Sequence, residues 1–344
     1  MRKGTVAAIL ALLMALLCAT AWAQETMKSG DYEYRLLDDG MVEITRYYGK
    51  DKSLDVPAEL DGRSVTGIGD DAVFLSSSLA SVTLPDSLIS IGRNPFTDCN
   101  KLLEIRVSPD HPVLDVIDGV LFSKPDKRLV CYPNARENTE YTVPKGVRII
   151  GDYAFGRCDT LKSITLPDSV TEIGNCAFLE CNLLSSITLP DSILSIGRHP
   201  FYGCDSLREI LVSPDHPALD VIDGALFSKT DKRMICYPPA LENTEYTVPK
   251  DVRIIGRYAF HGCESLMSIV LPDSVTEIND LAFCWCTSLT SITVPASVES
   301  IGIMPFYKCP NLTLTVPRDS YAARYAKENG IPYAYPDSHD WLND

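Results

Sequence analysis

A 23-residue repeat constrains this chain more than any other feature of its sequence. The segment LKSITLPDSVTEIGNCAFLECN, which begins at Leu161, returns as LSSITLPDSILSIGRHPFYGCD at Leu184. Self-similarity at a fixed period of this size indicates a solenoid, in which each unit buries its apolar side against its neighbours. Such a fold grows in one direction, so the 344 residues need not divide into several compact domains.

A leucine opens each copy of the repeat. These leucines are Leu79, Leu102, Leu161, Leu184, Leu207, Leu266, Leu289 and Leu312. Two of the gaps between them span 59 residues and contain near-identical segments, at 108–145 and 213–250. A super-repeat of 105 residues therefore overlies the shorter one and indicates an internal duplication. Inside each long gap, Asp118-Gly119 or Asp223-Gly224 separates two apolar runs, which is typical of a β-hairpin.

The apolar positions of one copy predict a short strand and an opposite wall. They are Leu161, Ile164, Leu166, Ile173 and Phe178. The first three alternate inward, so equivalent strands are expected to stack about 4.8 Å apart as a parallel sheet. Roughly ten or eleven such coils make a rod about 50 Å long.

A glycine follows the isoleucine of the wall in every copy but one, in which Asn279 takes the place of Gly174. Asparagine is the residue besides glycine that best tolerates a positive φ. We therefore expect a left-handed backbone turn at this position.

Both ends of the repeat region carry segments that predict caps. Residues 24–55 alternate polar and apolar side chains around Asp38-Asp39-Gly40, which predicts a β-hairpin that covers the first coil. The solenoid is expected over 56–317, with inserts near 108–140 and 213–245. Asp319-Ser320 can begin a helix that Gly330 ends, so residues 318–344 are expected to form a helical cap and tail.

The first 23 residues have the pattern of a secretory signal peptide. Arg2 and Lys3 precede an apolar run at 6–17, and Ala21-Trp22-Ala23 resembles a cleavage site. A membrane anchor is the alternative, but the run is too short to span a bilayer. We expect a secreted or cell-surface associated protein without a membrane span.

The charge of the chain argues against nucleic acid as a partner. The formal net charge is −15, and residues 1–23 contribute only Arg2 and Lys3, so the remainder carries −15 − 2 = −17. A chain this acidic repels phosphate backbones.

The pattern CxxLxSIxLPDSVTxIGxxAF resembles the leucine-rich repeats of the BspA-like (Treponema pallidum-type) family of bacterial surface and secreted proteins. The IDGxLFSK…CYP inserts and the terminal SYAARYAKENGIPY are also similar to that family, and the likeness covers about 31–335. The resemblance implies a β-rich solenoid, curved and right-handed. It further implies adhesin-like binding of host proteins or other bacteria, without shared catalytic residues.

Eleven cysteines follow residue 23, and seven share one repeat position. The seven are Cys99, Cys158, Cys181, Cys204, Cys263, Cys286 and Cys309. We interpret them as buried, reduced thiols, since cysteine is among the most buried residue types. Disulfides or metal ligands are the alternative, but parallel Cβ vectors disfavour bonds between neighbouring coils. Cys284-Trp285-Cys286 has no second motif to complete a zinc site, so no metal and no cofactor are expected.

Two surfaces are candidates for binding. The first consists of the outward positions of the stacked strands, which could alternatively serve only to keep the sheet soluble. These positions are Ser81, Thr83, Glu104, Arg106, Ser163, Thr165, Ser186, Thr188, Glu209, Ser268, Ser291 and Thr293. The second is the set of cations on the inserts, Lys124, Lys127, Arg128, Lys229, Lys232 and Arg233, which lie beside the aromatic residues Phe122, Tyr132, Phe227 and Tyr237.

The sequence thus predicts a secreted, monomeric, non-enzymatic protein that binds an extracellular protein or glycan. No residue stands out from the repeat as a nucleophile or base, so no catalytic residue is expected. A ligand-free spacer or scaffold is the first alternative, and a secreted hydrolase that uses a Cys–His pair is the second.

Overall fold

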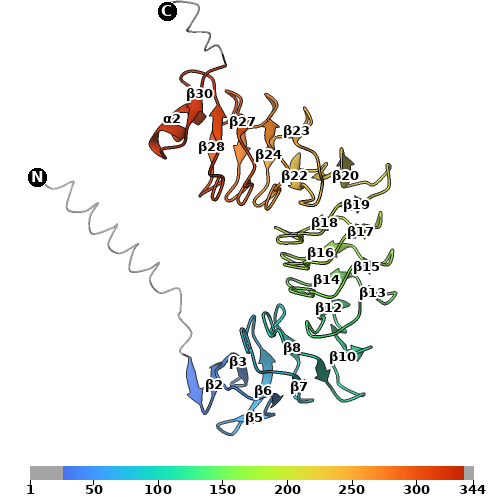
Figure 1. Ribbon diagram of the computed structural model, residues 1–344. Helices are drawn as coiled ribbons and strands as arrows, with labels where there is room; N and C mark the ends of the chain where they lie inside the picture. Colours follow the sequence, from blue (N-terminus) through green and yellow to red (C-terminus); the bar gives the residue numbers. More distant parts are fainter. Residues whose placement is uncertain (1–25, 337–344) are drawn as a thin grey trace, which may run out of the picture.

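The computed structural model describes residues 26–336 as a β-solenoid of about 13 turns with about 23 residues per turn. Figure 1 shows the coils stacked along a curved arc. The number of turns exceeds the expected ten or eleven because strands of the N-terminal hairpin and of the inserts also stack in register on the coils. The predicted signal peptide lies outside the described residues.

One long side of the arc, here named the front sheet, consists of the short strands that follow the repeat leucines together with additional strands that pair with them in parallel. Its strands are β4 (Ser53–Asp55), β7 (Ser81–Thr83) and β9 (Glu104–Arg106); β13 (Glu140–Thr142), β15 (Ser163–Thr165), β17 (Ser186–Thr188) and β19 (Glu209–Leu211); and β23 (Glu245–Thr247), β25 (Ser268–Val270), β27 (Ser291–Thr293), β29 (Thr313–Thr315) and β30 (Tyr333–Ala334). The additional strands are β4, β13, β23 and β30. Successive strands pair in parallel, with Ile164 opposite Ile187 and Ile187 opposite Ile210. The isoleucine of each strand points inward and its two neighbours point outward, as the alternation predicted.

The opposite side, here named the rear sheet, consists of the strands that carry the wall isoleucines. Its strands are β6 (Arg63–Ile68) and β8 (Ser90–Ile91); β12 (Arg128–Cys131), β14 (Ile149–Ile150), β16 (Glu172–Ile173) and β18 (Ser195–Ile196); and β22 (Arg233–Cys236), β24 (Ile254–Ile255), β26 (Glu277–Ile278) and β28 (Ser300–Ile301). Both sheets are interrupted twice, after β8 and β9 and after β18 and β19. The solenoid is therefore divided into three stacks, at 27–106, 114–211 and 219–334 (Figure 1).

Each insert begins a new stack. In the first, β10 (Leu114–Ile117) and β11 (Val120–Ser123) form the predicted hairpin around Asp118-Gly119, and β11 pairs with β12. The second repeats this with β20 (Leu219–Ile222), β21 (Ala225–Ser228) and β22. Strand β11 is buried on both faces: Leu121 contacts the core of the first stack, whereas Val120 and Phe122 contact the core of the second. Each insert therefore lies between two hydrophobic cores and contributes side chains to both.

The ends of the solenoid are closed by different elements. At the N-terminal end, β1 (Met27–Ser29), β2 (Tyr32–Leu36) and β3 (Val42–Tyr47) form an antiparallel meander, β3 joins the rear sheet, and β5 (Glu59–Leu60) pairs with β6. At the C-terminal end, the helix expected after Asp319-Ser320 is confirmed as α2 (Tyr321–Glu328). The Ser320 hydroxyl accepts a hydrogen bond from the Ala323 N–H, and Gly330 has a φ of +66°.

Stacked aromatic rings run through the second and third stacks. In the second, the centroids of Phe155 and Phe178 lie 5.5 Å apart, and those of Phe178 and Phe201 lie 5.4 Å apart. Tyr132, from the insert, adds a ring 5.4 Å from Phe155. Parallel stacking in register brings like residues together, so one phenylalanine per coil builds a continuous ladder.

The repeat cysteines lie beside this ladder as buried thiols, as predicted, except that Cys309 in the last coil is only half-buried. The Sγ of Cys181 donates to the carbonyl of Phe155 in the preceding coil over 3.0 Å, and Cys204 does the same to Phe178. Each thiol thus adds a hydrogen bond between neighbouring coils, to a carbonyl that also accepts from a backbone N–H of its own coil.

The expectation of a left-handed turn at the repeat glycine is wrong. Gly174 does not have a positive φ, and a Cβ there would lie 2.6 Å from the N of Asp152 and 2.8 Å from the C of Gly151. Close approach of neighbouring coils is what excludes a side chain. The left-handed residue lies two positions further on, at Cys176 with a φ of +51°. Nothing in the structure explains the asparagine at 279.

Candidate functional site

The front sheet brings the predicted strand-face residues into register. Ser163 lies beside Ser186, and Ser186 beside Glu209, while Thr165 lies beside Thr188. Equivalent columns form in the other two stacks. The outward side chains, most of them small and polar, therefore form one set of aligned columns in each of the three stacks.

The front sheet contains few groups that bind strongly. Arg106 is the one arginine among the predicted strand-face positions, and its Nε donates to Glu104 of the same strand over 2.7 Å. Both side chains are about half exposed (53% and 50%), so solvent screens this pair. Any recognition by this face therefore rests on many weak polar contacts.

The inserts place their cations and aromatic residues differently. Phe122, Tyr132, Phe227 and Tyr237 are all buried in the core. Lys127 and Lys232 are exposed at the surface. Lys124 is exposed too, but its Nζ donates to the carbonyl of His111 over 2.7 Å, and Lys229 contacts His216 in the same way.

The two remaining insert cations, Arg128 and Arg233, lie at the junctions between stacks. Arg128 donates through Nη2 to the carbonyl of Ile91 over 3.0 Å, which ties the second stack to the first. Arg233 pairs with Asp231 of its own insert over 2.9 Å. The same residue therefore bridges the first junction but makes only a local pair at the second.

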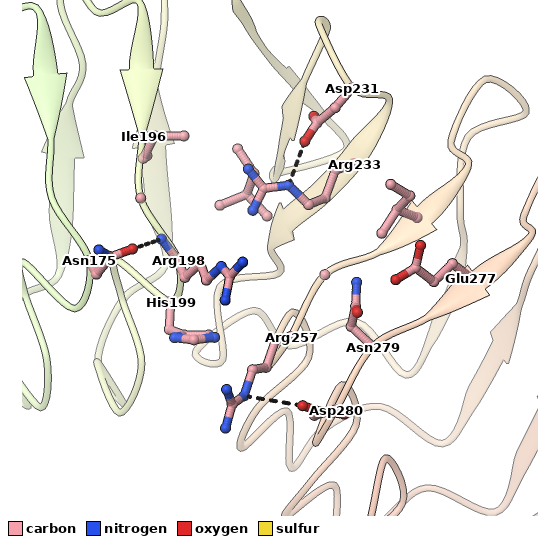
Figure 2. Close-up of a pocket in the computed structure, with 14 residues that line it drawn as sticks. Asn175, Ile196, Arg198, His199, Asp231, Arg233, Arg257, Glu277, Asn279 and Asp280 are labelled. Atoms are coloured by element: carbon pink, nitrogen blue, oxygen red, sulfur yellow. Dashed lines mark hydrogen bonds and ion pairs between the residues drawn. The ribbon is translucent and has the colours of Figure 1, made fainter. Parts of the chain in front are cut away.

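A polar pocket of about 520 Å³ occupies the second junction (Figure 2). Arg198 and His199, which follow β18, form one side of it, and Arg233 and Arg257 form the other. In Figure 2 the side chains of Arg198 and Arg233 extend from the two stacks toward the same opening. Sequence reasoning named only Arg233 of this group as a candidate.

The backbone fixes the positions of these arginines. Arg198 follows Gly197, whose N–H donates to the carbonyl of Ile173, and the Arg198 N–H donates to Asn175 Oδ1 over 2.8 Å. Arg257 occupies the same repeat position in the third stack, after β24. Its Nε lies 4.0 Å from Asp280 Oδ2. Within residues 26–336, the Arg198 guanidinium has no hydrogen bond or ion pair with another side chain.

His199 lies between the arginines and the interior. Burial, together with the charges of Arg257 and Arg198, lowers the pKa of His199 to about 4. Its Nε2 is buried without a hydrogen-bond partner among the described residues. The imidazole is therefore neutral at pH 7, and one of its nitrogens is unsatisfied.

One Cys–His pair does form, although the sequence did not single it out. The Sγ of Cys176 lies 3.9 Å from Nδ1 of His199. Burial raises the pKa of Cys176, while the pKa of His199 is lowered. A thiolate–imidazolium pair needs a lowered cysteine pKa and a raised histidine pKa. The shifts here are the opposite, so they favour the neutral thiol and the neutral imidazole.

The signal that identifies the second junction lies in the differences between the two 105-residue copies. Asp70, Asn94 and Asp152 of the first junction correspond to Asn175, His199 and Arg257 of the second. Asp98 and Arg157, which form an ion pair at 2.5 Å, correspond to Gly203 and Gly262. These departures from the repeat could have been read from the sequence.

The geometry defines a leucine-rich repeat solenoid, and comparison with known proteins supports this class. The family model described as "BspA type Leucine rich repeat region" matches this chain in six copies, over residues 59–124, 129–246 and 236–321. The chain therefore belongs to the BspA-type leucine-rich repeat family, as the resemblance of its motifs indicated.

Solved structures with the same fold come from bacterial proteins. A leucine rich cell surface protein from Faecalibacterium prausnitzii A2-165 is 24% identical, with a TM-score of 0.54 over 94% of this chain and 98% of that one. A leucine-rich repeat protein from Eubacterium ventriosum ATCC 27560 is 20% identical, with a TM-score of 0.52 over 81% and 93%. The pneumococcal vaccine antigen PcpA is 19% identical, with a TM-score of 0.50 over 85% and 82%. No curated protein matches the chain.

No helix within 26–336 is long and apolar enough to cross a membrane. The same part of the chain holds no group of three or more His, Cys, Asp or Glu side chains arranged to bind a metal ion.

Proposed function

We propose that this protein is exported and acts as a non-catalytic, monomeric, adhesin-like protein that recognises a protein or glycan at a cell surface. The observation that carries the proposal is the front sheet, in which outward side chains from successive coils align in register over three stacks. A repeated polar face suits a partner that is itself extended and repetitive, because many weak contacts then add up.

Three further features support the proposal. Residues 1–23 have the pattern of a signal peptide, which fits removal on export. The family consists of repeat proteins, and two of the similar structures are described as a cell surface protein and a vaccine antigen. In this proposal residues 56–317 present the binding faces, and the segments before and after them serve as caps.

The experiment compares cell binding by the wild type with binding by two surface variants. The front-sheet variant is Thr165→Arg with Thr188→Arg, at two exposed positions in adjacent strands. The insert variant is Lys127→Glu with Lys232→Glu, also exposed. Deleting the inserts is not a usable test, because their strands are walls of two cores.

Fluorescently labelled protein is added to host and bacterial cells, and bound protein is measured by flow cytometry. We expect the wild type to bind saturably and the front-sheet variant to bind about tenfold more weakly, since bulky charges break the aligned polar face. The insert variant tests the second candidate surface, to which Lys127 and Lys232 belong. Absence of saturable binding on every cell type would contradict the proposal and favour a ligand-free spacer.

A further inference from the structure

The internal duplication gives this protein two copies of one junction, and they differ in charge. At the first junction, Arg93 pairs with Asp70 at 2.6 Å and with Asp152, across the gap between stacks, at 3.5 Å. The arginine is thus neutralised from both sides by carboxylates of the protein itself.

The second junction keeps the arginine and loses both carboxylates. Arg198 corresponds to Arg93, but Asn175 stands in the place of Asp70 and Arg257 in the place of Asp152. These two replacements change the charge by +3, and Asp280, whose equivalent 105 residues earlier is the neutral Asn175, lowers the net change to +2. Two guanidinium groups thus line one pocket at the second junction, where the equivalent residues of the first junction form an ion pair.

Other contacts that close the first junction are also missing at the second. Asn94 Nδ2 donates to the carbonyl of Tyr153 over 2.8 Å, whereas His199 contacts the corresponding Tyr258 only through its ring. Arg128 donates to the carbonyls of Ile91 and Gly92 across the first junction. The pocket of about 520 Å³ is located where these ties are absent.

We propose that the second junction binds a carboxylate- or sulfate-bearing sugar of an acidic glycan, with the anionic group between Arg198 and Arg257. The bound anion takes the place of the carboxylates that neutralise Arg93 in the first junction. Arginine suits this role because its planar guanidinium binds such groups in a bidentate way. The unsatisfied Nε2 of His199 and the unpaired guanidinium of Arg198 are the two groups left to receive it.

The rest of the pocket favours a sugar over an acidic peptide. Asp231, Glu277 and Asp280 also line it, and their carboxylates accept hydrogen bonds from hydroxyl groups. A run of acidic side chains would be repelled by the same three groups. Each unit of an acidic glycan brings hydroxyl donors beside its anion, which an acidic peptide does not, and this matches a wall of arginines beside carboxylates.

This inference rests on the proposed function for the origin of the ligand, and it is tested separately with defined probes. Tri-galacturonic acid and a sulfated chondroitin tetrasaccharide are titrated by calorimetry, with neutral galactotriose and hexaglutamate as comparisons. We expect both acidic sugars, or one of them, to bind to the wild type, with affinity that falls as NaCl is raised. The probe that binds identifies carboxylate or sulfate as the anion.

The decisive variant restores the residues of the first junction. Asn175→Asp with Arg257→Asp and Asp280→Asn gives Arg198 the two carboxylates that pair with Arg93 and puts no carboxylate beside the new Asp at 257. We expect its affinity for the acidic sugar to fall by about tenfold or more. Arg198→Gln, at an exposed side chain, should give a similar loss without any new pairing.

The reciprocal variant places the site at the first junction. Asp70→Asn with Asp152→Arg places the two arginines of the second junction there, and we expect it to add a second binding event. Unchanged affinity in both loss variants would overturn the inference, as would tighter binding of hexaglutamate than of either sugar. If the wild type binds cells but none of the sugars, the inference falls while the proposed function stands.

Discussion

Replacing Phe178 with alanine is expected to lower the free energy of unfolding by about 3–5 kcal/mol. The Phe178 ring is fully buried and stacks on Phe155 and Phe201, so its removal leaves a cavity bounded by two other coils. Coils of a solenoid contact only their neighbours, and a gap in one coil weakens its contacts on both sides. The measurement is urea unfolding followed by circular dichroism.

Leu194→Ala is the matched control in the next coil. Its side chain is 67% exposed, and its removal should change stability by no more than about 0.5 kcal/mol. Equal losses from the two substitutions would mean that the aromatic ladder does not hold the coils together.

Gly174→Ala is expected to destabilise the protein by about 1–3 kcal/mol, although it adds only one methyl group. That methyl would meet backbone atoms of the preceding coil at 2.6 and 2.8 Å, and backbone cannot rotate away as a side chain can. Thermal unfolding monitored by calorimetry measures the effect.

Asn279→Ala is the control for Gly174→Ala, since position 279 is the same place in another coil and already has a Cβ. We expect a much smaller change there. If alanine is tolerated equally at both positions, then close packing of coils is not the reason for the glycine.

The coil could be predicted from the sequence because its residues repeat. Leu161, Ile164 and Phe178 recur at fixed spacing, and each repetition strengthens the same interpretation. The cysteine of each coil was placed in the core for the same reason. The error at Gly174 has a physical origin: glycine serves both positive φ and close approach, and a sequence pattern does not distinguish the two.

The role of the inserts could be predicted only in part. Asp118-Gly119 indicated a hairpin correctly, but the sequence did not show which of the aromatic residues beside it belong to the core, where all four lie. Their unbroken apolar runs, such as Val120, Leu121 and Phe122, are the signature of a strand buried on both faces. A strand that lies between two cores must be apolar on both faces, whereas a strand of a hairpin that projects into solvent would alternate apolar and polar side chains.

The candidate site at the second junction could not be found from either copy alone. Arg198 and Arg257 are 59 residues apart and belong to different stacks, and they line one pocket only because the two stacks meet at the second junction. Comparison of the two copies would have shown that Asp152 changes to Arg257 while Arg93 is kept as Arg198. Differences between internal repeats therefore carry functional information that the repeats themselves do not.

A crystal structure of the full chain grown with selenate tests the central claim most directly, namely that two copies of one junction differ so that only the second accepts an anion. The account predicts an anomalous selenium peak between the guanidinium groups of Arg198 and Arg257, with Arg93 paired to Asp70 and Asp152. A second junction closed by its own side chains, with no selenium there or with equal occupancy at both junctions, would contradict it.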